Sequence, residues 1–270
     1  MEQKEMRADI ALCAQGLATS REKARKLIEA GLANVNGTAI LKPSQTVRPS
    51  DALSVVGQVY PYVSRGGLKL EKALRAFEVP VFDLTCMDIG ASTGGFTDVL
   101  LRNGARRVYA IDVGTGQLDQ RLLCEPRVIS MEHVNARSLD IAMFEIPPTL
   151  GVMDVSFISI RLILPAAFTV LGPAGRMIAL IKPQFEAGKA LVGKRGIVSK
   201  PEVHRMVLEQ LASFVLTQGW SVRALDYSPI AGGDGNLEFL ADMLPQAQCN
   251  HQIDSREIDA VVKQAHSIRL

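Results

Sequence analysis

Short apolar runs recur along the second part of the chain, separated by polar or amphipathic stretches. The runs cover residues 86–89, 107–113, 128–131, 151–155 and 177–181. A long amphipathic stretch at 201–218 predicts a helix, and 220–227 and 236–243 predict two closing strands. Because buried strands alternate with helices, the pattern predicts an α/β fold built on a parallel sheet.

The N-terminal part has a different pattern, that of a helix followed by a hairpin. Positions 24, 27 and 28 form one apolar face, and Thr19 and Glu22 have the spacing of a capping box at the helix start. Gly31 ends this helix, and Asn36-Gly37 is a tight turn between two short strands. Residues 53–59 predict a further strand. The N-terminal part is therefore a small α+β unit.

These two patterns divide the chain into two domains, residues 1–62 and 63–270. The chain has 270 residues, which exceeds one average domain. Pro61 ends the N-terminal unit, just after its last predicted strand. At the other end of the chain, Asp254 and Glu257 cap a last helix that ends near His266.

Composition narrows the class of protein. No apolar stretch approaches the roughly 18 residues of a membrane-spanning helix, and the N-terminus lacks the apolar core of a secretory signal. We therefore expect a cytoplasmic protein with no membrane segment. Cys13, Cys86, Cys124 and Cys249 stand far apart, so neither a zinc site nor a disulfide framework is expected.

The charge is unevenly distributed. The whole chain has a net charge of +2, but residues 1–76 carry twelve Lys and Arg against seven Asp and Glu. This basic segment favours a polyanionic partner, although a solvated surface has the same charge pattern. The candidate contacts to this polyanion are Arg7, Arg21, Lys23, Arg25, Lys26 and Lys42. Cations of this kind bind phosphates and supply affinity with little reading of base sequence.

A glycine-rich turn follows the first apolar run of the second domain. It comprises Gly90, Ala91, Ser92, Thr93, Gly94, Gly95 and Phe96. Glycines at such a turn let the backbone approach a ligand closely. Asp112 lies 22 residues after Gly90, at the end of the next strand, which suits a carboxylate that accepts the hydroxyls of a ribose. A nucleoside cofactor is implied, and a turn that serves packing alone is the alternative.

The turn has the pattern G-x-x-x-G-G. It lacks both the G-x-G-x-x-G of dinucleotide-binding proteins and the Gly-Lys-Ser/Thr of a phosphate-cradling loop. S-adenosylmethionine fits better than either nucleotide because it has no phosphates. No cluster of metal-ligating residues is evident, so no metal is expected.

Four charged residues complete the candidate site. Asp154 and Lys182 follow predicted parallel strands, whose carboxyl ends face the ligand crevice of such sheets. Lys69 and Glu238 join them from a helix and from a closing strand. Taken one by one, Lys69 is equally well a solvated helix charge and Glu238 the polar phase of an alternating strand.

These motifs together resemble the TlyA family of ribosomal RNA 2′-O-methyltransferases, which is similar to FtsJ-type enzymes with a Lys-Asp-Lys-Glu tetrad. The resemblance rests on the glycine turn 90–96, the four charged residues, Val155-Ser-Phe157 and Lys182-Pro-Gln-Phe-Glu186. Residues 16–28 and Val35-Asn-Gly37 likewise resemble a small RNA-binding domain first described in a ribosomal small-subunit protein. The resemblance covers nearly the whole chain. It implies a Rossmann-like methyltransferase sheet behind an RNA-binding domain.

What the resemblance implies is methyl transfer from S-adenosylmethionine to a cytidine 2′-hydroxyl in ribosomal RNA of the 30S subunit, the 50S subunit or both. The catalytic residues are then Lys69, Asp154, Lys182 and Glu238, with Lys182 as the base. A ribose hydroxyl is a poor nucleophile at neutral pH, so a positioned base assists the transfer. Lys189, in a glycine-containing loop, is a further candidate RNA contact.

Two other classes of function stay open at this point. One is a ribosome-assembly protein that binds RNA through an inactive methyltransferase domain; the intact set of four charged residues argues against it. The other is a haemolysin, a name that the family sometimes carries. The absence of a spanning helix and of a strongly amphipathic basic helix argues against direct membrane lysis.

Overall fold

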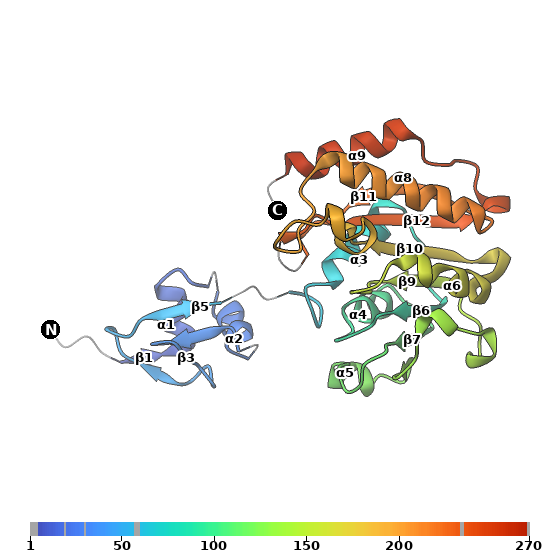
Figure 1. Ribbon diagram of the computed structural model, residues 1–270. Coiled ribbons are helices and arrows are strands. Elements are labelled where there is room, and N and C mark those ends of the chain that lie inside the picture. Colours follow the sequence, from blue (N-terminus) through green and yellow to red (C-terminus); the bar gives the residue numbers. More distant parts are fainter. Residues whose placement is uncertain (1–4, 19, 30, 57–59, 233–234, 269–270) are drawn as a thin grey trace. The chain divides into compact units, whose positions relative to one another are not determined.

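The computed structural model describes residues 5–18, 20–29, 31–56, 60–232 and 235–268 (Figure 1). The chain forms two compact units, Met1–Pro61 and Tyr62–Leu270. Within the described residues no helix is long and apolar enough to cross a membrane, and no group of three or more His, Cys, Asp or Glu is arranged to hold a metal ion.

Unit 1 is a small α+β fold. Helices α1 (Ala8–Ala14) and α2 (Arg21–Glu29) lie beside a three-stranded antiparallel sheet of order β3-β2-β5 and a two-stranded ribbon of β1 and β4. The strands are β1 (Met6–Arg7), β2 (Ala33–Val35), β3 (Thr38–Ala39), β4 (Thr46–Val47) and β5 (Leu53–Val55). Leu12, Leu27, Ile28, Ile40 and Val47 form the centre of its core.

One local prediction for unit 1 is confirmed, and two others involve residues outside the described part of the chain. The Asn36-Gly37 turn is confirmed: both residues have positive φ, 50° and 82°, as a two-residue hairpin turn of the primed type requires. Thr19, the predicted cap, and residues 57–59 of the predicted strand lie outside the described residues. The side chain of Ser20 accepts the backbone N–H of Lys23 and so caps α2.

Unit 2 is built on a seven-stranded sheet of order β11-β12-β10-β9-β6-β7-β8. The strands are β6 (Thr85–Ile89), β7 (Arg107–Ile111), β8 (Val128–Met131), β9 (Leu150–Met153), β10 (Arg176–Ile181), β11 (Trp220–Tyr227) and β12 (Phe239–Pro245). The first five are parallel, as predicted, but β12 runs antiparallel to both β10 and β11. Strand periodicity carries no information on direction, so the antiparallel strand was not predicted.

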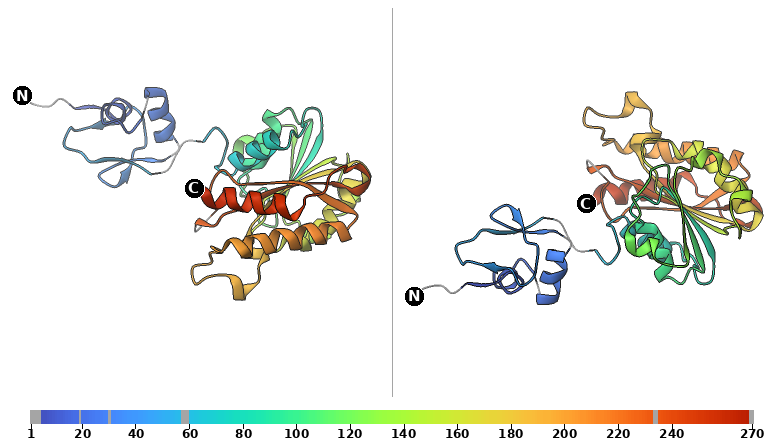
Figure 2. Two further views of the ribbon diagram at one scale, coloured as in Figure 1. Left: turned by 90° about the horizontal axis from the view of Figure 1, so that it is seen from above. Right: turned by 90° about the horizontal axis from the view of Figure 1, so that it is seen from below.

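Helices cover both faces of this sheet (Figure 2). The α-helices are α3 (Gly67–Ala76), α4 (Gly95–Arg102), α5 (Gln120–Leu123), α6 (Leu164–Leu171), α7 (Pro183–Glu186), α8 (Pro201–Thr217) and α9 (Ser255–Ser267). Short 3₁₀ turns are η1 (Ala136–Ser138), η2 (Ile141–Met143), η3 (Ile160–Leu162), η4 (Gly172–Ala174), η5 (Lys189–Leu191) and η7 (Gln246–Gln248).

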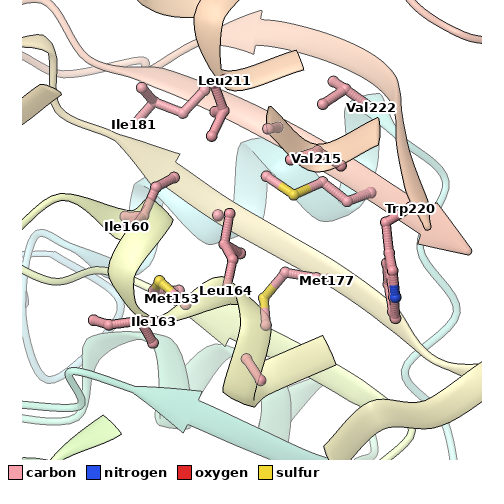
Figure 3. Close-up of a cluster of buried hydrophobic side chains, with 14 of the residues drawn as sticks. Met153, Ile160, Ile163, Leu164, Met177, Ile181, Leu211, Val215, Trp220 and Val222 are labelled. Atoms are coloured by element: carbon pink, nitrogen blue, oxygen red, sulfur yellow. The ribbon is translucent and has the colours of Figure 1, made fainter. Parts of the chain in front are cut away.

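Alternate residues of each strand enter two separate cores. Met177 and Ile181 join α6 and α8 on one face, whereas Ile178 and Leu180 join α3 and α4 on the other. In the first core Trp220 stacks on Phe168 with ring centroids 4.1 Å apart. Figure 3 shows Trp220 in that cluster together with side chains of η3, α6 and α8. Apolar packing on both faces fixes the strand ends on which the site is built.

The predicted C-terminal helix is confirmed as α9. Asp254 accepts the backbone N–H groups of Arg256 and Glu257, and the Glu257 side chain accepts the N–H of Asp254, which completes the capping box. The helix packs against α8, where Nδ1 of His204 lies 2.9 Å from Nε2 of His266.

Candidate active site

The glycine turn joins β6 to α4, and its conformation depends on two glycines. Gly90 has φ +82°, and a Cβ there would lie 2.6 Å from the backbone oxygen of Asp154. Gly94 has φ +93°, and its Cβ would collide with Leu122. At Gly90 the neighbour is backbone and cannot move aside, whereas at Gly94 the neighbours are the ends of leucine side chains, so the positive φ is the main constraint there. At Gly90 this close packing brings the turn against the residue that follows β9.

A cavity of about 200 Å³ opens beside the turn. Six of the seven predicted turn residues line it, whereas Gly94 packs away from it against Leu118 and Leu122. Asp154 and Lys182 also line the cavity, together with Ser64, Gly66, Asp88 and Ser156, which sequence reasoning did not single out as site residues. Ser64 and Gly66 carry no motif, so only the folded chain reveals them.

Asp88 is an unusual group in this cavity wall. It is fully buried on β6, and its Oδ2 accepts a 2.7 Å hydrogen bond from the hydroxyl of Thr97. Its other oxygen, Oδ1, has no partner among the described residues. Burial raises the pKa of Asp88 to about 7, an effect that the Thr97 hydrogen bond opposes. An unpaired buried acceptor beside a cavity is suited to a ligand that brings a donor or a positive charge.

Asp112 follows β7 and is held by two backbone N–H groups. Its Oδ2 accepts Ser92 N–H at 2.8 Å, and its Oδ1 accepts Gly114 N–H at 2.7 Å. A carboxylate has about four acceptor positions, so two are left for hydroxyl groups. Asp112 lines a small hollow that shares Ala91 and Ser92 with the main cavity. The glycine turn and Asp112, the residue predicted to bind a ribose, are therefore neighbours.

The four predicted charged residues converge. Nζ of Lys69 lies 2.6 Å from Oε2 of Glu238 and 3.8 Å from Oδ2 of Asp154. Nζ of Lys182 lies 2.6 Å from Oδ1 of Asp154. Asp154 thus stands between the two lysines, and two positive and two negative groups balance one another at the carboxyl ends of β9 and β10.

Burial differs across this cluster. Glu238 is 2% and Lys69 8% exposed, whereas Asp154 is 20% exposed. Burial raises the pKa of Glu238, and the nearby Lys69 ammonium opposes that change. Glu238 comes one residue before β12. It is therefore not the polar position within a strand that was the alternative interpretation of the sequence. The inner pair, Lys69 with Glu238, is thus shielded, and the outer pair, Asp154 with Lys182, faces the cavity.

Ser156 and Phe157 follow Asp154 and extend the site outward. Lys182 donates a 2.7 Å hydrogen bond from Nζ to the hydroxyl of Ser156. Phe157 has φ +65°, which is rare for an aromatic residue, and it is 91% exposed. Its ring lies 5.3 Å from the ring of Phe185, on α7. An exposed aromatic ring therefore lies one residue after Ser156, the residue whose hydroxyl accepts from the base candidate Lys182.

The candidate RNA contacts of unit 1 are all exposed, but most are ion-paired. Arg7 and Arg21 both donate to Asp9, a fully buried carboxylate that the sequence did not mark as special. Two pairs on α2 have i,i+4 spacing, Lys26 with Glu22 at 2.9 Å and Arg25 with Glu29 at 3.9 Å. Lys23 and Lys42 have no acidic partner among the described residues. Lys189, in unit 2, begins η5 and is exposed.

Comparison with known proteins agrees with this architecture. Residues 62–243 match the FtsJ-like methyltransferase family, and residues 6–53 match the S4 domain. YqxC of Bacillus subtilis, named provisionally as an rRNA methyltransferase, is 46% identical over 269 residues, which cover 98% of this chain and 96% of YqxC. TlyA of Mycobacterium tuberculosis, named 16S/23S rRNA (cytidine-2′-O)-methyltransferase, is 38% identical over 262 residues and 97% of each chain.

A solved structure is similar to this chain over nearly its whole length. The Streptococcus thermophilus protein, named provisionally as a hemolysin, superposes with a TM-score of 0.76 at 46% identity, and the match covers 98% of this chain and 97% of that one. Relatives named for rRNA methylation and for hemolysis thus share one architecture. The chain belongs to the FtsJ-like methyltransferase family, and within it to the TlyA-type proteins that carry an S4 domain ahead of the methyltransferase domain.

Proposed function

We propose that this protein transfers a methyl group from S-adenosylmethionine to the 2′-hydroxyl of a cytidine in ribosomal RNA, in the 30S subunit, the 50S subunit or both, and that it does so in the cytoplasm. The observation that carries the proposal is the convergence of Lys69, Asp154, Lys182 and Glu238 beside the glycine-turn cavity. A relative that covers 97% of the chain is named for this reaction on both 16S and 23S rRNA.

The cavity residues fit S-adenosylmethionine. Oδ1 of Asp88 is buried and has no hydrogen-bond partner in the part of the chain that the structure describes, which suits the cofactor's positive charge. Asp112 has acceptor positions left for the two ribose hydroxyls. Gly90, Ala91, Ser92, Thr93, Gly95 and Phe96 line the wall between these two carboxylates. Gly94 shapes the turn from behind. When bound, the cofactor supplies a sulfonium methyl that needs no activating metal.

In this proposal Lys182 accepts the proton of the ribose hydroxyl. Oδ1 of Asp154 and Oγ of Ser156 lie within hydrogen-bonding distance of its Nζ, at 2.6 and 2.7 Å. In the neutral amine these two acceptors engage both N–H groups, so the lone pair is left for the incoming hydroxyl. Lys69 places a second cation near Asp154 and thereby offsets the negative charge of that carboxylate. Glu238 neutralises Lys69 in turn and holds it in place.

Phe157 supplies a surface for the target base. The Phe157 ring is 91% exposed, and its backbone conformation is strained. Strain of this kind costs free energy and is found mostly at functional sites. Stacking on an aromatic ring is worth about 1–3 kcal/mol per base and is how unpaired bases are usually held. Phe157 lies within three residues of Asp154 along the chain, and its segment contacts Lys182 through Ser156. A base stacked on Phe157 brings its own ribose toward the lysine.

The S4 domain supplies RNA affinity by charge. Arg7 and Arg21 share the buried carboxylate of Asp9, which fixes both guanidinium groups, and Lys23 and Lys42 have no acidic partner among the described residues. Arg25, Lys26 and Lys189 are exposed and join this phosphate-binding set. Contacts to phosphates give strong salt dependence and little base specificity. Choice of the nucleotide then depends on the shape of the folded RNA.

The test is methyl transfer from labelled S-adenosylmethionine to purified 30S and 50S subunits that lack the modification, followed by nuclease mapping of the labelled nucleotide. We expect label on a cytidine ribose with the native protein. With Lys182→Ala we expect the rate to fall by about 10²–10⁴-fold while cofactor binding is retained. Cofactor binding without transfer to either subunit would support an RNA-binding assembly protein. Leakage of liposomes by the pure protein would support the hemolysin name.

A further inference from the structure

Two segments of unit 2 lie side by side and are linked by three successive contacts. One segment is 156–160, which follows β9, and the other is 182–186, which contains α7. Ser156 contacts Lys182, Phe157 contacts Phe185, and Ile160 contacts Glu186. The first two contacts involve groups to which the proposed function gives a role. The third contact, at Glu186, has no role in that function.

Glu186 is a buried carboxylate whose acceptor positions are filled from the neighbouring segment. It is 6% exposed. Its Oε2 accepts a 2.6 Å hydrogen bond from the hydroxyl of Ser159, and its Oε1 accepts the backbone N–H of Ile160 at 2.8 Å. Arg161 neutralises the charge through Nε, 3.3 Å from Oε2, and also donates to the backbone oxygen of Glu186.

These bonds fix the far end of the segment that carries Phe157. Its near end is fixed at Asp154, whose N–H donates to Ile89 on β6. Ile160 is 2% exposed and belongs to the apolar core between α6 and β10, where Figure 3 labels it. Between the two fixed ends, Phe157 adopts φ +65°. A non-glycine residue keeps such a conformation only where its surroundings impose it, and Glu186 supplies the polar part of that constraint.

We propose that Glu186 is a positioning residue for methyl transfer. It acts through Ser159 and Ile160 to hold segment 156–160 so that Ser156 meets Lys182 and Phe157 presents its ring. The proposal rests on the proposed function, since the ring and Lys182 matter only if a nucleotide is methylated there. A carboxylate serves better than an amide because both of its oxygens accept and its charge pairs with Arg161. An amide nitrogen would either face the Ile160 N–H as a donor or, on the side of the Ser159 hydroxyl, leave Arg161 Nε without its carboxylate acceptor.

The experiment compares three variants of the full-length protein. Glu186→Gln converts one acceptor into a donor, and Ser159→Ala removes a single hydroxyl and leaves the chain able to fold. Glu209→Gln is the matched control: Glu209 is a helix glutamate on α8 that pairs with Arg205 at 3.0 Å, away from the site. For each, S-adenosylmethionine affinity is measured by calorimetry, methyl transfer to ribosomal subunits by kcat and KM, and backbone order by hydrogen–deuterium exchange.

We expect Glu186→Gln to lower kcat about tenfold, with KM for the subunit and cofactor affinity within about twofold of the native values. A charge-assisted hydrogen bond is worth roughly one decade, and phosphate contacts elsewhere dominate RNA affinity. Exchange should accelerate at residues 156–161 and nowhere else. Ser159→Ala should also lower kcat, by a smaller factor, with KM and cofactor affinity nearly unchanged. Glu209→Gln should match the native protein in all three readouts.

Two results would overturn the proposal. One is unchanged exchange at 156–161 in Glu186→Gln. The other is a loss of activity that is matched by an equal loss of cofactor affinity and by faster exchange throughout unit 2, which marks a general structural role. The exchange readout requires no substrate. If the native protein methylates neither subunit, the proposed function fails, while exchange still decides whether Glu186 orders the segment.

Discussion

Nζ of Lys69 lies 2.6 Å from Oε2 of Glu238, and both side chains are buried. Removing one partner of a buried ion pair leaves an uncompensated charge, which typically costs about 3–5 kcal/mol, whereas replacing both with apolar residues costs far less. Glu238→Ala is therefore expected to lower the free energy of unfolding of unit 2 by about 3 kcal/mol. The double variant Lys69→Met with Glu238→Leu is expected to recover most of that loss, although it lacks both charged groups and is not expected to transfer methyl groups.

This prediction is measured by urea unfolding that is followed through Trp220, the single tryptophan, which lies in the core of unit 2. Glu209→Ala, which breaks an exposed helix pair, serves as the control and should cost less than about 1 kcal/mol. A double variant as unstable as the single one would show that the pair contributes through packing rather than through charge.

Asp88→Asn is expected to stabilise the protein without cofactor and to weaken cofactor binding. Burial raises the pKa of Asp88 to about 7, so between about pH 4 and 7 the folded chain keeps a proton that the unfolded chain releases. Stability that this group contributes at low pH is consequently lost as pH rises through 7. Asparagine does not ionise, so at pH 8 we expect a gain of about 2 kcal/mol after allowing for one poorly paired amide.

The measurement is thermal unfolding at pH 5 and pH 8, with calorimetric titration of S-adenosylmethionine at pH 8. Asp259→Asn, on the exposed side of α9, is the control and should shift neither quantity. If Asp88→Asn binds the cofactor as tightly as the native chain does, Asp88 does not contact it.

Phe157→Ala is expected to reduce kcat/KM for the ribosomal subunit by about tenfold or more, because base stacking contributes about 1–3 kcal/mol. Phe157→Tyr keeps the ring and should retain most of the activity. The comparison with Phe82→Ala, another exposed aromatic residue of unit 2, tests whether the effect is specific to the site. Equal rates for Phe157→Ala and Phe82→Ala would remove Phe157 from the proposed mechanism.

The strand ends were the part of the site that could be predicted from sequence. Asp154 and Lys182 follow apolar runs, and the carboxyl ends of neighbouring parallel strands meet at one edge, so their proximity follows from the topology. The burial of Lys69 could not be predicted, because a helix lysine has the same sequence pattern whether it is solvated or paired. It is buried only because α3 packs beside β12, a long-range contact that periodicity does not encode.

Two further features could not be predicted from the sequence for the same reason. The predicted strand at 236–243 begins only at Phe239, since the side chain of Asn236 instead bonds to Val198 N–H and to the backbone oxygen of Gly196. Asp9 is separated from Arg21 by twelve positions along the chain, and nothing in its neighbourhood marks it as buried. Local patterns predict elements, whereas partners for single polar side chains depend on the packed fold.

The packing of α9 on α8 should weaken in mild acid. His204 is fully buried, and the carbonyl of Val198, 3.1 Å from Nε2, can only accept. Nε2 of His204 therefore carries the proton, so Nδ1 accepts from Nε2 of His266. Burial, followed by the nearby His266, lowers the pKa of His204 from 6.5 to about 4. A second proton on His204 would turn its Nδ1 into a donor, so the hydrogen bond from His266 would be lost unless His266 changed tautomer.

The direction of the pH dependence of stability follows from the lowered pKa of His204. Above about pH 6.5 the ring is neutral in both the folded and the unfolded chain, and below it only the unfolded chain takes up the proton until about pH 4. The contribution of His204 to stability should thus fall by about 1.4 kcal/mol per pH unit across this window, whereas the buried Asp88 changes stability in the opposite direction over much of the same range. His204→Gln keeps an N–H that can donate to Val198 but does not titrate, so relative to the native protein its unfolding midpoint should rise as the pH falls from 6.5 to 4.5. His133→Asn, which replaces a histidine outside this contact, should keep the native slope. An equal slope in His204→Gln would mean that other groups cause the acid sensitivity of this unit.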